Sequence, residues 1–113
     1  MYTPFENLPE DSKIWIYQSN RKLSDDEVIS ITEKCQQFVE NWSAHGTSLE
    51  ASFLLKYNRF IIFGVNQEVH QATGCSIDAS VHFIQQLEQE FKIEERMEEI
   101  NRSKTAVSVE TQD

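Results

Sequence analysis

The feature that most limits the fold of this chain is its longest uninterrupted apolar run, the six residues from Phe60 to Val65. The run follows a turn signal at Asn58, and its consecutive apolar positions would bury both faces of a strand. Six residues are far fewer than the roughly 20 that a helix needs to cross a bilayer. We therefore expect a central strand of a sheet here, and no segment that spans a membrane.

Two further segments have the composition of strands. Residues 13–18 are rich in β-branched and aromatic side chains, which favour extended backbone. Residues 49–57 alternate between apolar positions on one face and positions such as Glu50, Ser52 and Lys56 on the other. This alternation is typical of a half-exposed strand, so we expect it at an edge of the sheet.

A helix is predicted to begin just after Ser24. Ser24 can accept a hydrogen bond from the first turn, and Glu27, three residues on, completes a capping box. Gly46 can adopt the left-handed backbone that ends a helix. Between these limits, apolar side chains recur at helical spacing over about four turns, at Val28, Ile31, Cys35, Phe38, Val39 and Trp42.

A second helix is predicted from about Ser76 to Phe91, and we expect it to continue, or to re-form, through Arg102. Residues 104–110 alternate again, which predicts either a short edge strand or a polar tail.

The order of these segments predicts the fold. Strand, helix, strand, strand, helix and a possible last strand is the βαββα(β) order of a ferredoxin-like α+β sandwich, an antiparallel sheet with two helices on one face. We expect an extended lead-in over residues 1–12, a single domain over residues 13–102, and a polar tail or short edge strand over residues 103–113.

The charge balance and the cysteine count restrict the class of protein. The chain has 10 Lys and Arg against 19 Asp and Glu, a formal net charge of −9, which disfavours nucleic acid as a partner. Two cysteines cannot form a disulfide framework, so we expect a reducing compartment, the cytoplasm. With three glycines, no phosphate-cradling loop can form. We expect no cofactor and no metal.

The sheet face that the helices leave open must carry either Trp15 and Tyr17 or Ile14 and Ile16. Monomers rarely leave a large apolar patch in water, so something should cover it. We expect a homodimer through this face, with Trp15 and Tyr17 at the interface. The alternative is that residues 1–12 fold back over the patch.

The topology gathers basic residues at one end of the sheet. Arg21 and Lys22 follow the first strand, and Asn58 and Arg59 lie in the predicted hairpin, beside the N-terminus of the first helix. Helix N-termini and arginines favour phosphate or carboxylate, so a small anionic ligand is one expectation. The alternative is that these charges offset the acidic residues 25–27.

The opposite end gathers Cys75, His45 and Asp78. A cysteine at a helix N-terminus has a lowered thiol pKa, His45 could approach it, and Asp78 could orient the histidine. This arrangement suggests a small thiol-dependent or hydrolytic enzyme. The alternative is a small buried thiol with Ser76 or Asp78 capping the helix.

Four segments, Trp15–Arg21, Ala44–Gly46, Lys56–Ile62 and Ala72–Asp78, resemble a family of small uncharacterised bacterial proteins often labelled "ABC transporter ATPase". The resemblance covers roughly residues 12–92. The phosphate-binding loop that such an ATPase requires is absent from this sequence, and the family carries no activity onto particular residues. We therefore expect a small binding or self-association domain, with the thiol enzyme and the anion-binding site as alternatives.

Overall fold

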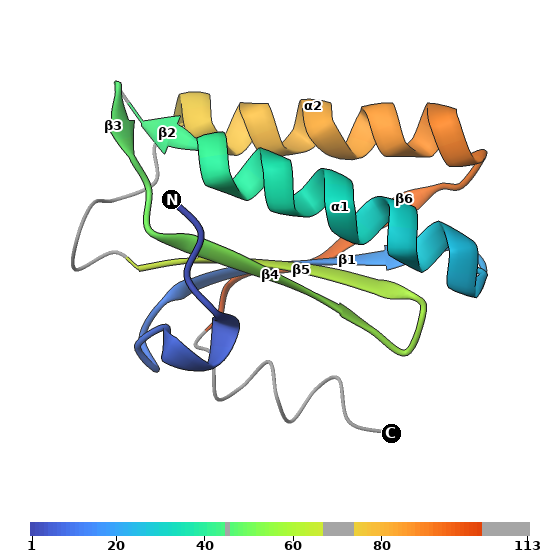
Figure 1. The fold of residues 1–113 in the computed structure, drawn as a ribbon, viewed down its shortest axis with the longest axis horizontal. Coiled ribbons are helices and arrows are strands. Elements are labelled where there is room, and N and C mark those ends of the chain that lie inside the picture. The colour runs from blue at the N-terminus through green and yellow to red at the C-terminus, as the bar shows by residue number, and fades with distance from the viewer. Residues whose placement is uncertain (45, 67–73, 103–113) are drawn as a thin grey trace.

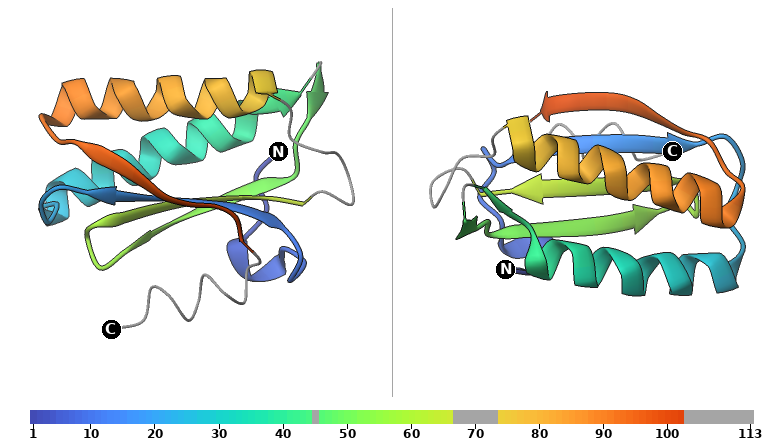
Figure 2. Two further views of the ribbon diagram at one scale, coloured as in Figure 1. Left: turned by 180° about the vertical axis from the view of Figure 1, so that it is seen from behind. Right: turned by 90° about the horizontal axis from the view of Figure 1, so that it is seen from above.

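The computed structural model describes residues 1–44, 46–66 and 74–102. Two helices lie side by side over one face of an antiparallel sheet, and a short 3-10 helix lies under the opposite face (Figures 1 and 2). The fold is therefore α+β, as predicted. The elements in chain order are η1 (Phe5–Asn7), β1 (Lys13–Ser19), α1 (Asp25–Asn41), β2 (Ser43–Ala44), β3 (Thr47–Ser48), β4 (Ala51–Lys56), β5 (Phe60–Val65), α2 (Gly74–Phe91) and β6 (Glu95–Arg102).

The main sheet has the strand order β4-β5-β1-β6, and every neighbouring pair is antiparallel. The apolar run predicted as a central strand is β5, which lies between β4 and β1 and buries five of its six residues. The half-exposed strand predicted at an edge is β4. Tyr57 and Asn58 both have positive φ angles, 56° and 52°, and form the tight turn that joins the two strands.

Helix α1 begins with the predicted capping box. The Glu27 backbone N–H donates to Ser24 Oγ (3.2 Å), and the Ser24 N–H donates to Glu27 Oε1 (2.9 Å). The helix ends at Asn41, before the predicted glycine stop, with Trp42 as its C-cap. Its buried face carries Ile31, Cys35 and Val39, which belong to the predicted stripe. Neither described helix has the length and apolar content that a membrane span requires.

The prediction that the second helix runs through Arg102 is wrong. Helix α2 ends at Phe91, Lys92 has a φ of 54°, and the Ile93 N–H donates to Glu88 O (3.1 Å). This is a Schellman C-cap with lysine in the left-handed position. The buried side chain of Ile93 anchors the chain, which then pairs as β6 with the free edge of β1. The predicted strand over residues 104–110 lies outside the described residues.

Trp15 and Tyr17 point toward the helices, which corrects the prediction that they lie on the open face. Trp15 is 0% and Tyr17 4% exposed, within the same buried cluster as Ile31 of α1 and Leu87 of α2. The register explains this placement, because Trp15 is paired with Phe63 and shares the helix-facing side of the sheet with it.

The outer face of the sheet carries Ile14, Ile16 and Ile62, and the lead-in covers them. Phe5 and Leu8 pack against these isoleucines in a second buried cluster. Gly64 makes this packing possible. A Cβ atom there would lie 2.8 Å from Leu8 Cδ1, 3.0 Å from Ile14 Cδ1 and 3.3 Å from Phe5 Cε2. The lead-in thus covers part of the sheet face that was predicted to bind a second copy of the chain.

We predict that Gly64→Val destabilises the protein by about 1–3 kcal/mol, because the branched side chain overpacks the site that Leu8 fills. Urea unfolding measures the effect. The matched control is the same substitution in a Leu8→Ala background, where the shortest of the three contacts is removed and the extra cost of the valine should be smaller. If Gly64→Val destabilised both proteins equally, the packing of Leu8 would not require a glycine at position 64.

Candidate functional site

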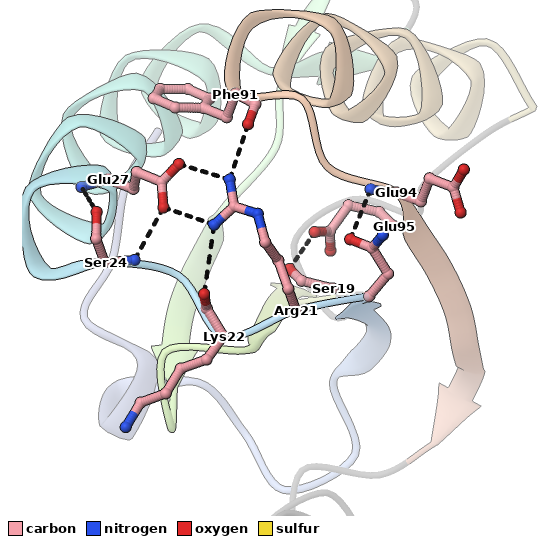
Figure 3. A network of polar contacts seen from close by, with 9 residues as sticks. Ser19, Arg21, Lys22, Ser24, Glu27, Phe91, Glu94 and Glu95 are labelled. Carbon is pink, nitrogen blue, oxygen red and sulfur yellow. Dashed lines mark hydrogen bonds and ion pairs between the residues drawn. The ribbon is translucent and has the colours of Figure 1, made fainter.

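The basic residues predicted to bind an anion do gather at one end of the sheet, but Arg21 has protein partners. Its guanidinium donates to both carboxylate oxygens of Glu27 (2.8 and 2.7 Å) and to the Phe91 carbonyl (2.9 Å), as Figure 3 shows. The hydrogen bond from Arg21, with a smaller contribution from the Ser24 N–H, lowers the Glu27 pKa to about 2. Arg21 therefore fastens the start of α1 to the end of α2.

The hairpin residues meet the β1–α1 loop through their backbone. Asn58 O accepts from the Leu23 N–H (2.6 Å), and Arg59 O accepts from the Ser19 N–H (2.8 Å). The Asn58 side chain donates to Asp25 Oδ1 (3.3 Å), while Lys22 is exposed. The alternative prediction was that the basic charges offset the acidic first turn of α1. Arg21 does this, because it pairs with Glu27. Anion binding by Arg21, Lys22, Asn58 and Arg59 stays a prediction.

Glu95, the first residue of β6, places a carboxyl group beneath α2. It accepts a hydrogen bond from the Ser19 hydroxyl (Figure 3). Its N–H donates to Glu88 Oε2 (2.9 Å), and its Oε1 is buried without a hydrogen-bond partner in the described part of the chain. Burial raises the Glu95 pKa to about 7; the Ser19 bond lowers it and the Glu88 charge raises it. Glu95 also raises the thiol pKa of Cys35, which burial itself raises most.

The thiol site predicted at the other end lies largely outside the described residues. His45 is not described, and Cys75 belongs to the first turn of α2 without a described side chain. Asp78 is exposed on α2. The Cys75–His45–Asp78 arrangement therefore stays a prediction. No cluster of three or more His, Cys, Asp or Glu side chains suited to a metal ion occurs within residues 1–44, 46–66 and 74–102.

A groove between α1 and α2 offers a cavity that the sequence did not indicate. It has a volume of about 500 Å³, and its floor is formed by Phe38 of α1, by Trp42 at the C-cap of α1, and by Phe83 and Leu87 of α2. The Phe38 and Phe83 rings stack across the two helices with centroids 4.6 Å apart and planes 12° apart. The rings of Phe38, Trp42 and Phe83 all contact Phe63 of β5 from the same side.

A polar contact lies at each end of this groove. At one end Trp42 Nε1 donates to the Ser76 carbonyl (2.8 Å), which ties the end of α1 to the start of α2. At the other end Lys34 Nζ lies 3.3 Å from Glu90 Oε1, and both side chains are substantially exposed, at 38% and 52%. The sides carry the polar residues Gln37, Asn41, Ser43 and Gln86.

The groove is not predictable from the apolar pattern of the two helices, because that pattern assigns apolar positions only to the core. At helical spacing one face of α2 carries Ile77, Val81, Ile84, Leu87 and Phe91, and Phe83 lies outside this face. The one available signal was Phe83, a large aromatic residue that lies outside the core-facing stripe of its helix. Phe83 contributes to a groove only because Phe38 of α1 lies next to it. The sequence pattern of one helix does not show which residue of another helix lies beside it.

We predict that folding stability falls as the pH rises from about 4.5 to about 7. In this interval the unfolded chain releases the Glu95 proton near its ordinary pKa of 4.5, whereas the folded protein holds it until about 7. Glu95→Gln should remove this slope, and the variant should be more stable than the parent at pH 8. Urea unfolding between pH 5 and 8 tests it, with Glu94→Gln, an exposed neighbour, as control. Equal slopes for the parent and Glu95→Gln would contradict the assignment.

Comparison with known proteins does not assign the chain to a family. No family model, no curated protein and no solved structure matches it. The resemblance to the small bacterial proteins described above therefore stays a prediction from the sequence. The groove between α1 and α2 is a cavity built from the described residues of the chain itself.

Proposed function

We propose that this protein is a small-molecule binding module and that its binding site is the groove between α1 and α2. The observation that carries the proposal is a cavity of about 500 Å³ with an aromatic floor and polar ends. Ligand pockets in proteins typically measure about 300–1,000 Å³ and combine apolar and aromatic walls with a few polar groups. The lining of this groove has the same balance.

Binding fits the lining better than catalysis does. The residues that line the groove include one lysine and one glutamate, Lys34 and Glu90, which pair with each other near the surface. The remaining polar side-chain groups of the lining are three amides, the Ser43 hydroxyl and the Trp42 indole N–H, which donates to the Ser76 carbonyl. A nucleophile held beside a general base is the usual arrangement in covalent catalysis, and this lining contains none.

Three further assignments from the sequence, the topology, the family and the compartment, are also proposals. We propose a ferredoxin-like topology, supported by the strand order β4-β5-β1-β6 and by two helices on one face. We propose membership in the family of small bacterial proteins, supported by the four segments that resemble it. We propose a reducing compartment such as the cytoplasm, supported by the free, buried thiol of Cys35.

Self-association is the second candidate function, and the hairpin end of the outer face favours it. Leu54 and Phe60 are only partly buried there, and Tyr57 in the turn is 50% exposed. A second copy of the chain could cover these side chains without displacing Phe5 and Leu8. The homodimer proposal thus moves from Trp15 and Tyr17 to this end of the sheet.

We predict that filling the groove abolishes binding of an uncharged, environment-sensitive dye such as Nile red. Ala79 lines the groove at an exposed position of α2, so Ala79→Trp should occupy the cavity with little effect on folding. Fluorescence titration should show dye affinity at least about tenfold weaker, a loss of about 1.4 kcal/mol or more.

The matched control is Gln85→Trp, an exposed position of α2 outside the groove, which should leave the affinity unchanged. Equal binding to the parent and to Ala79→Trp would refute the groove as the site. If Phe60→Ala alone reduced dye binding, the outer sheet face would replace the groove as the apolar surface, and light scattering would then measure the oligomeric state.

A further inference from the structure

We propose that the ligand of the groove is an amphipathic organic cation: an apolar or aromatic body with one ammonium or amidinium group. This inference rests on the proposed binding function and specifies its ligand. Lys34 of α1 and its C-cap Trp42, at opposite ends of the groove, are eight residues apart, which corresponds to about 12 Å along a helix. The ligand is therefore a small molecule of roughly this length.

The charge of the two helices is the first argument for a cation. Helix α1 carries five acidic residues and one basic residue, and α2 carries three acidic residues and no lysine or arginine. Lys34 is thus the single Lys or Arg on the two helices that form the groove. The whole chain has a net charge of −9, so its field attracts cations to this surface and slows the approach of anions.

The second argument is the counter-ion at the end of the groove. Glu90 lines the cavity and is paired with Lys34, whose side chain is 38% exposed. An exposed pair of this kind contributes little to stability, so Lys34 can swing into water when another cation arrives. A ligand ammonium would then take its place on the Glu90 carboxylate while the apolar body of the ligand lies on the floor.

The third argument is the chemistry of the floor and sides. Phe38, Phe83 and Leu87 line the groove and give the apolar or aromatic body of the ligand a surface to pack against. The Asn41 side-chain N–H donates to the Gln37 carbonyl (2.9 Å), which leaves its amide oxygen as an acceptor. An apolar floor with one carboxylate and side-chain amide oxygens in the lining suits a ligand that joins an apolar body to a donor-rich positive group.

Three probes with one naphthalene body and different charges test this inference: 1-naphthylmethylammonium, 1-naphthylmethanol and 1-naphthoate. Titrations monitored by the backbone amide signals of α1 and α2 give each dissociation constant. The cation should bind about tenfold more tightly than the anion, and the neutral probe should lie between them. Glu90→Gln should weaken cation binding about fivefold and leave the neutral probe unchanged, whereas Lys34→Gln should strengthen cation binding by removing the competing ammonium.

Glu33→Gln is the matched control, because it removes one negative charge from an exposed position of α1 outside the groove and should alter cation binding little. If all three probes bind with equal affinity and Ala79→Trp blocks them, the cation inference is overturned and the binding function stands. If the anion binds most tightly and requires Lys34, the ligand class is reversed. If no probe binds, or if Ala79→Trp has no effect on binding, the proposed function itself fails.

Discussion

The aromatic packing around Phe63 is the interaction on which the rest of this structure depends. From the centre of β5, this one ring contacts Tyr17 of β1, Phe38 of α1, Trp42 at its C-cap and Phe83 of α2, with centroids 5.6–6.3 Å apart. Such pairs add about 0.5–1.5 kcal/mol each to the burial of apolar area. The same cluster joins the sheet to both helices and supplies the floor of the groove, so core packing positions the proposed binding surface.

Local patterns predicted most of the elements because each carried its own periodicity or end signal. The capping box fixed the start of α1, and the unbroken apolar run identified β5 as a central strand. The pattern failed at β6. Its glutamates have the composition of a solvated helix, and the end of α2 at Lys92 has no glycine to mark it. Pairing with the edge of β1, which is distant in sequence, decides the structure there.

The candidate site was less predictable, for two physical reasons. In β1 both faces are apolar, so the alternation alone cannot say whether Trp15 or Ile14 faces the helices; the partner residues on β5 decide it. At the basic end, Arg21 and Glu27 are six residues apart, with a turn between them that brings a bidentate pair together. Sequence spacing placed both groups at one end of the sheet, but only the geometry shows that they bind each other.

The groove is held open by contacts at both ends of α2. Trp42 binds the Ser76 carbonyl near its start, and Arg21 binds the Phe91 carbonyl at its end. Between these points the stacked rings of Phe38 and Phe83 set the distance between the helices. A groove fixed in this way is formed before a ligand arrives, so binding requires little ordering of the protein, and more of the contact energy remains as affinity. The hydrogen bonds at the two ends of α2 thus support the proposed binding site by holding its walls in place.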